Sequence, residues 1–143
     1  MFRSRTNCLD GEQYLCAQTG RELDNKTILV GVSPNTGNQF ILSGLLRSDW
    51  VTANQMAPRI SSRYVSDMRM ASQQELEVLH AARDMGALAE KFEDIASRGH
   101  GWMWSGDTIH YATETAWVKS LSHGGIAGHH KDERYIVPLV KDL

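Results

Sequence analysis

Two apolar segments near the start of the chain are separated by a short polar segment. Residues 27–32 and 39–46 are rich in Ile, Val, Leu and Phe, whereas residues 33–38 are of the types that form turns. This pattern predicts a β-hairpin with a six-residue loop. Residues 1–25 are more polar than the rest of the chain, so we expect residues 1–45 to form an N-terminal arm and hairpin, a candidate docking segment.

Helical spacing follows the hairpin. Ser48 or Asp49 can cap a short helix that runs from Trp50 to Met56, and Pro58 should end it because proline lacks an N–H and restricts the preceding residue.

A second helix is predicted from a capping box. Ser72 and Glu75 have the spacing at which each side chain satisfies a free backbone N–H, and apolar residues then recur along one face from Leu76 onward. Gly86 should break or bend this helix, which we expect to continue to Gly99.

After residue 100 the spacing changes to that of strands. Trp102 and Trp104 alternate with smaller residues, residues 115–121 are β-branched and aromatic, and residues 134–140 are apolar on both faces. Pro138 cannot donate to a ladder, so it should lie at a bulge or where its missing N–H faces no neighbour. The order of elements predicts an α+β fold, with two main helices and a central antiparallel sheet with long loops.

Several short motifs occur in a fixed order over residues 50–143. They are Arg69, Glu75 and Leu76 within residues 66–76, Trp102-Met103-Trp104-Ser105, Ala116-Trp117 followed by Leu121 and Gly124, and the closing segment Ile136-Val137-Pro138-Leu139-Val140. In these motifs the segment resembles the C-type-lectin-like C-terminal domain of bacterial adhesins and phage tail proteins. The resemblance implies a C-type-lectin-like fold for residues 46–143, in one compact unit with residues 1–45.

The chain also departs from that family. Met68, Ala71, Val137 and Leu139 replace a tryptophan, a proline and two arginines of the family's motifs. We therefore expect the closing strand to be more deeply buried, against the N-terminal hairpin. The family's calcium-binding signatures are missing, so calcium-dependent sugar recognition is not supported.

The resemblance implies that loops between the last strands form the binding face, as expected when a rigid scaffold holds functional loops. These loops are residues 106–114 and 122–133. Tyr111 is either a binding anchor or a partly buried loop tyrosine, and the sequence leaves both readings open. The candidate binding residues are Asp107, His110, Tyr111, Glu114, His123, His129 and His130, with Asp132 and Glu133 nearby.

Other conspicuous residues are expected to be structural. The three tryptophans at motif positions suit core packing better than stacking on sugars, and Arg69 suits an ion pair within the fold. The predicted structural set is Arg69, Glu75, Leu76, Trp102, Trp104, Trp117 and Pro138.

No motif indicates a metal, a cofactor or catalysis. His129 and His130 would point to opposite faces of a strand, and neither zinc-ligand spacing nor a phosphate-binding or nucleophile motif occurs. The interpretation is therefore a protein that is not an enzyme, with an intracellular enzyme related to sulfatase-modifying proteins of similar fold as a remote alternative. Cys8 and Cys16 are expected to be free thiols, although a later disulfide stays open.

Charge and hydropathy limit the partners and the cellular location that the sequence allows. With a net charge of −2 the chain lacks the excess of positive charge that nucleic-acid binding requires, and no apolar run is long enough to enter a membrane. Together with an N-terminus that does not resemble a signal peptide, the resemblance favours a phage virion protein made in the host cytoplasm. We expect it to decorate the head or attach to the tail in multiple copies or as a homo-oligomer, binding a neighbouring virion protein or the host surface. A bacterial surface adhesin is the alternative.

Overall fold

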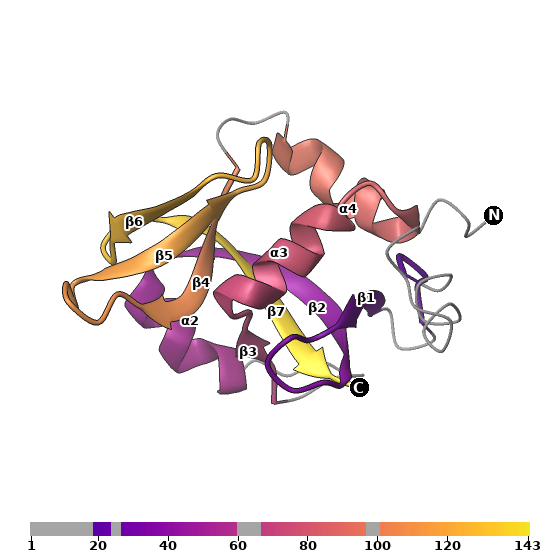
Figure 1. Ribbon diagram of the computed structural model, residues 1–143, viewed down its shortest axis with the longest axis horizontal. Coiled ribbons are helices and arrows are strands. Elements are labelled where there is room, and N and C mark those ends of the chain that lie inside the picture. Colours follow the sequence, from indigo (N-terminus) through magenta and orange to yellow (C-terminus); the bar gives the residue numbers. More distant parts are fainter. Residues whose placement is uncertain (1–18, 24–26, 60–66, 97–100) are drawn as a thin grey trace.

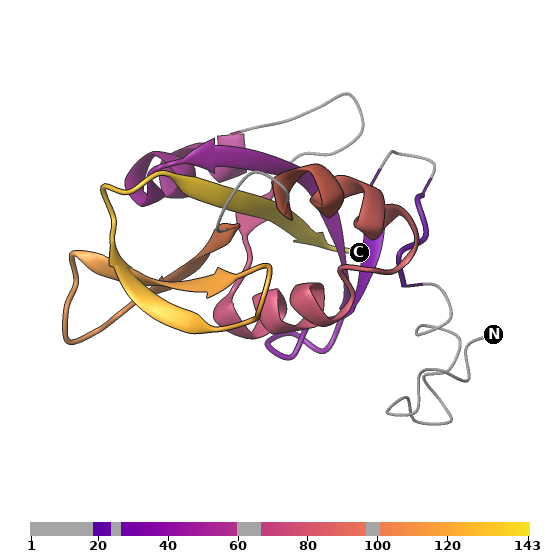
Figure 2. The same cartoon turned by 90° about the horizontal axis from the view of Figure 1, so that it is seen from above.

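The structure is a computed structural model that describes residues 19–23, 27–59, 67–96 and 101–143. Within these residues the chain is an α+β fold of seven strands in one mixed sheet and three short α-helices (Figures 1 and 2), which confirms the predicted class. The elements are β1 Ile28–Val32, β2 Gln39–Ser48, α2 Trp50–Met56, the 3-10 turn η3 Ala57–Arg59, β3 Arg69–Met70, α3 Gln73–Ala81, α4 Gly86–Ala96, β4 Trp102–Thr108, β5 Thr115–Ser120, β6 Ile126–His130 and β7 Tyr135–Asp142.

Strand β7 lies at the centre of the sheet. The order is β1-β2-β7-β4-β5-β6, and the short β3 pairs with the end of β7. Every pairing is antiparallel except that of β4 with β7, which is parallel where Met103 lies beside Ile136. The prediction of an antiparallel sheet was wrong at this pair. The chain reaches β4 through helices rather than a tight turn, so no hairpin fixes the direction of β4 against its neighbour.

The predicted hairpin at the start of the chain is confirmed. Strands β1 and β2 pair antiparallel around residues 33–38, where Gly37 adopts a positive φ of 76° and donates to the Ser33 carbonyl at 2.9 Å. Strand β2 then pairs with β7 from Phe40 to Ser48. The boundary expected between the N-terminal segment (residues 1–45) and the lectin-like segment (residues 46–143) therefore falls inside strand β2.

Two helix starts and the break at Gly86 form where the sequence predicts them, whereas the predicted end at Gly99 lies outside the described residues. The Asp49 carboxylate accepts from the Thr52 N–H at 3.2 Å at the start of α2. Ser72 and Glu75 form a complete capping box at the start of α3. At Gly86, which has a φ of 51°, the predicted long helix is divided into α3 and α4.

The helices cover both faces of the sheet. Helices α3 and α4 pack with β1, β2 and Met103 of β4 in one cluster of buried side chains, and α2 packs with Trp104, Ala116 and Val118 in a second cluster. Figures 1 and 2 show α2 apart from the α3–α4 pair across the sheet. Burial on both faces explains why residues 136–140 are apolar without alternation.

The three motif tryptophans differ in burial. Trp104 is fully buried at 0% exposure, as predicted. Trp102 is partly buried against the second cluster, and Trp117 is also only partly buried, outside both clusters. The prediction that Trp117 belongs to the core was wrong. Its neighbour on β6 is Gly128, which has no side chain to cover the ring.

Pro138 lies where the partner of β7 changes. On one edge β7 pairs with β4 at Ile136 and with β3 at Leu139 and Val140, so Pro138 falls between the two partners. A missing N–H there removes no bond to β4 or β3, which explains how a buried proline is tolerated in a central strand. Among the described residues, none of the helices is long and apolar enough to cross a membrane.

Candidate functional site

One end of the sheet gathers most of the polar residues that sequence reasoning selected. It consists of residues 109–114, which join β4 to β5, and residues 131–134, which join β6 to β7; we call these two segments the loop end. It lies at the left of Figure 1, beside the start of α2. The pairing of Thr115 with His130 and the Lys131 N–H bond to the Glu114 carbonyl, 2.9 Å long, hold the two segments side by side.

Backbone hydrogen bonds fix the first segment. The Ala112 N–H donates to the Ile109 carbonyl at 3.0 Å, and the Ala112 carbonyl accepts from both the N–H and the hydroxyl of Thr115, at 2.8 and 2.6 Å. Ile109 is buried, so its side chain anchors the base of the segment. Tyr111 stands at the turn between these fixed points.

Trp50 of α2 fixes the second segment. Its N–H donates to the Lys131 carbonyl at 3.0 Å, its ring nitrogen donates to the Ser105 carbonyl at 2.8 Å, and the Lys131 ammonium lies 4.0 Å from its ring centroid. The ring nitrogen of Trp104 donates to the Glu133 carbonyl at 3.2 Å. Sequence reasoning missed Trp50 and Lys131, because nothing local to residues 49–50 indicates that they meet residues 131–133.

Four of the seven predicted binding residues lie at or directly beside the loop end, and their side chains are exposed. Tyr111 is 74% exposed, so the reading as a partly buried loop tyrosine was wrong. The ring of His110 stands edge-on to it, with centroids 5.3 Å apart. Glu114 is exposed, and exposed His130 lies 3.3 Å from the Asp132 carboxylate.

His123 lies at the other end of the β5–β6 hairpin. It belongs to the turn after β5, whereas His130 pairs with the first residue of β5. Five steps along a strand separate Thr115 from Ser120, or roughly 17 Å. His123 therefore does not share a contact surface with Tyr111, as the sequence had suggested.

Asp107 and His129 are engaged within the fold. The Asp107 carboxylate accepts from the Gln73 N–H at 2.8 Å, at the positive end of α3. His129 lies in β6, where its Nδ1 is 2.6 Å from the Tyr135 hydroxyl and its ring centroid is 5.0 Å from that of Trp102. Burial raises the pKa of Tyr135, and the negative charge of nearby Glu133 raises it further. Both residues were predicted in loops, and that placement was wrong: Asp107 belongs to β4, and β6 occupies part of residues 122–133.

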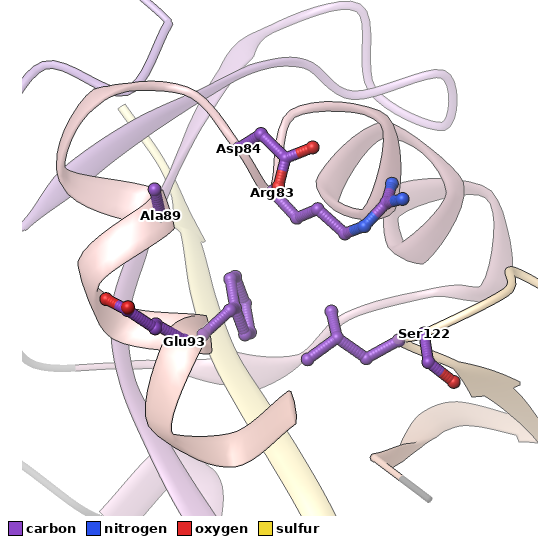
Figure 3. A pocket seen from close by; sticks show the side chains of 7 residues that line it. Arg83, Asp84, Ala89, Glu93 and Ser122 are labelled. Carbon is purple, nitrogen blue, oxygen red and sulfur yellow. The ribbon is translucent and has the colours of Figure 1, made fainter. Parts of the chain in front are cut away.

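A separate hollow lies between the end of α3, α4 and the turn after β5 (Figure 3). Its volume is about 520 Å³, and its lining combines apolar Phe92 and Leu121 with charged rim residues. The Arg83 guanidinium on that rim donates to the His80 carbonyl at 2.7 Å. The rim carries charges of both signs, and Arg83 already forms a hydrogen bond within the chain. The hollow therefore does not direct several hydrogen-bond donors toward one ligand. The lining residues are Arg83, Asp84, Ala89, Phe92, Glu93, Leu121 and Ser122.

His80 lies near this hollow with its ring against Gly124, where a Cβ would come within 2.8 Å of the ring. Its Nε2 is buried without a hydrogen-bond partner. Burial lowers the pKa of His80, and the positive charges of Arg83 and Lys119 lower it further. We therefore interpret His80 as a neutral ring that supports the turn after β5 by packing against Gly124.

The described residues contain no group of three or more His, Cys, Asp or Glu side chains placed to hold a metal ion. Cys8 and Cys16 lie outside the described residues. What the loop end can do with the groups present is make directional polar and aromatic contacts.

Comparison with protein-family models finds no match to this chain, and comparison with curated protein sequences finds none either.

Proposed function

We propose that this protein is a non-catalytic binding module whose contact surface is the loop end, with Tyr111 as its central anchor. The observation that carries the proposal is a tyrosine 74% exposed at the tip of a segment fixed by backbone hydrogen bonds at both ends. Exposed large aromatics on rigid supports are typical binding hot spots, because they contribute a large contact area and lose little conformational entropy on binding.

The polar groups around Tyr111 support recognition rather than simple adhesion. The His110 ring stands edge-on to Tyr111. Exposed Glu114 and His130, the latter 3.3 Å from the Asp132 carboxylate, add donors and acceptors at or beside the loop end. Polar groups of this kind give directional contacts near an exposed aromatic side chain, a combination that occurs in many protein interfaces.

We further propose that the fold is C-type-lectin-like, in the branch without the sugar-binding calcium site. The order of elements supports this assignment: the motif residues Glu75 and Leu76 lie in the first turn of a helix, and Trp102, Ala116 and Ile136 each lie in a strand of the same sheet. The resemblance of these motifs to those of phage tail proteins and adhesins supports a virion as the setting, with a bacterial cell surface as the alternative.

The contact surface is tested with two matched variants. Tyr111→Ala removes the proposed anchor, and Met56→Ala removes an exposed apolar side chain from the far end of α2, at 45% exposure. Binding of the fluorescently labelled chain to purified phage particles and to intact host bacteria is measured for both. We expect Tyr111→Ala to weaken binding at least about tenfold, on the scale of a hot-spot residue, with an unchanged melting temperature, and Met56→Ala to bind like the parent chain.

Equal binding by the Tyr111→Ala variant would place the contact surface elsewhere. A His123→Ala variant then reports on the opposite end of the hairpin, which the structure separates from the loop end. Antibody labelling of purified particles distinguishes the two settings, because a virion protein is retained on them and a bacterial surface protein is not.

A further inference from the structure

The two outer strands of the sheet are protected differently. Along the outer side of β1, Gly20 donates to the Leu29 carbonyl at 2.8 Å, Leu29 donates to the Arg21 carbonyl at 3.0 Å, and Glu22 bridges to Ile28. Along the outer side of β6 the described residues place no strand or segment (Figures 1 and 2). Among the described residues, one edge of the sheet is therefore covered by the chain itself, and the other is left open.

The pairing with β5 shows which groups of β6 face outward. The Gly125 carbonyl accepts from Ser120 and the Lys131 N–H donates to Glu114, so the odd-numbered residues of this strand bond to β5. Antiparallel pairing alternates, so the backbone groups of Ile126, Gly128 and His130 point away from β5. These three residues are also the exposed ones, Ile126 at 48%.

Strand β6 has none of the features that usually protect an edge. Its sequence is Ile-Ala-Gly-His-His, with no lysine, acidic residue or proline, and it pairs with β5 without a bulge. Natural sheets normally place charges, prolines or bulges at such edges to prevent pairing with another chain. An edge without them is available for pairing with another chain.

We propose that β6 pairs antiparallel with β6 of a second copy of this chain, about a twofold axis at Gly128. The outward groups are self-complementary in this register, because Gly128 faces the partner's Gly128 and each Ile126 faces the partner's His130. No like charges lie directly opposite, and Gly128 brings no side chain to the axis, because the chain's own Ile109 fills the position that its Cβ would take. The two loop ends then lie at opposite ends of the joined strands. Only His130, beside the loop end, belongs to both surfaces, because it faces the partner's Ile126.

The small area that one strand edge can bury limits the expected affinity of the dimer. A pairing over five residues falls below the size of stable interfaces, so we expect weak association, with a Kd on the order of 100 μM. Sedimentation velocity of the full chain from about 5 to 500 μM, a range chosen to bracket that value, should show a concentration-dependent dimer. Ile126→Lys should raise the Kd at least about tenfold, because a charge on the edge opposes pairing. Val51→Lys introduces the same charge at a similarly exposed position of α2, 45% against 48%, and should leave the Kd unchanged.

The register is tested by cross-linking in a chain with Cys8→Ser and Cys16→Ser. The double variant Ile126→Cys with His130→Cys places cysteines opposite each other across the axis, at about 5.5 Å between Cα atoms, within disulfide range. Each single variant places its cysteines about 13 Å apart and should not cross-link. A chain that stays monomeric throughout, a dimer unaffected by Ile126→Lys, or equal cross-linking by a single variant would each overturn the proposal.

Discussion

At the scale of single residues, the Glu75 carboxylate connects parts of the chain that are distant in sequence. It is fully buried, and it accepts from the Arg69 guanidinium at 2.5 and 2.8 Å, from the Ser33 hydroxyl at 2.5 Å and from the Ser72 N–H at 2.9 Å. Arg69 in turn contacts Asp142 at 2.8 Å. One side chain thus joins the β1–β2 loop, β3 and the start of α3, and through Arg69 the end of β7. The sequence predicted the capping box and an ion pair for Arg69, and both are confirmed.

This network makes stability depend on pH. Burial raises the pKa of Glu75, but the hydrogen bonds from Arg69, Ser33 and Ser72 outweigh it and hold the pKa below the ordinary value of 4.5. A carboxylate with a lowered pKa in the folded state stabilises the fold above its unfolded pKa, and that stabilisation is lost as the pH falls through the folded pKa. We therefore expect the free energy of unfolding to decrease below about pH 4.5.

The variant Glu75→Gln tests this contribution. At pH 7 it should lose about 2–3 kcal/mol, near the lower limit for breaking a buried pair, because Arg69 is 37% exposed. Its stability should also fall less steeply than that of the parent chain below pH 4.5. Asp142→Asn removes the more exposed partner, 30% exposed, and should cost less than about 1 kcal/mol. Urea unfolding at pH 7, 5 and 3.5 measures both, and parallel pH profiles for Glu75→Gln and the parent chain would contradict the assignment.

At the scale of elements, Gly86 separates α3 from α4 by a close contact of two backbones. Its φ is 51°, and a Cβ there would come within 2.5 Å of the Gly20 carbonyl oxygen, which accepts from the Ala87 N–H at 2.8 Å. Gly37 has a similar φ of 76° with no atom within 4 Å of its Cβ position. The two glycines therefore differ in steric contact, not in backbone conformation.

The pair Gly86→Ala and Gly37→Ala separates these effects. Gly37→Ala should cost about 1–2 kcal/mol from the left-handed conformation alone. Gly86→Ala adds a clash with fixed backbone atoms and should cost about 2–5 kcal/mol, because overpacking typically contributes about 1–3 kcal/mol more. Thermal unfolding of both variants gives the comparison, and equal costs would mean that the Gly20 contact contributes nothing.

The elements that sequence reasoning predicted are those with local signals. The hairpin loop, the caps at Asp49 and Ser72 and the break at Gly86 each depend on residues within a few positions, and all are present. Strand β6 was missed because Gly and His carry little strand preference, so its conformation depends on pairing with β5.

Burial on the sheet depends on what covers each face. Trp104 and Trp117 occur in equally strand-like segments, yet only Trp104 faces a packed layer that includes α2. The candidate site shows the same limit. The sequence identified polar residues near the strands, but the pairing of β5 with β6 decides that His130 lies opposite Thr115, next to the loop end, and that His123 does not. The role of Asp107 at the start of α3 likewise required the tertiary structure.

At the scale of the whole molecule, the sheet joins the start and the end of the described chain. Strand β2 pairs with β7 across eight residue pairs, and the hairpin contributes Ile28, Val30, Phe40 and Leu42 to the cluster beneath α3 and α4. Each such buried side chain contributes roughly 1.5–3 kcal/mol, and together they contribute about 6–12 kcal/mol. That sum is comparable with the total stability of a typical domain, about 5–15 kcal/mol.

A chain shortened to residues 46–143 should therefore not fold. It retains only residues 46–48 of β2, so β7 loses most of its pairing on one edge and Leu76 and Leu79 of α3 lose the apolar side chains packed with them. A chain that begins at residue 19 keeps every described contact and should unfold cooperatively with a melting temperature close to that of the full chain. Circular dichroism during heating and the dispersion of amide NMR signals compare the two. Cooperative unfolding of the 46–143 chain would mean that the hairpin is an appendage rather than part of the core, because the remaining strands would then form a stable sheet without it.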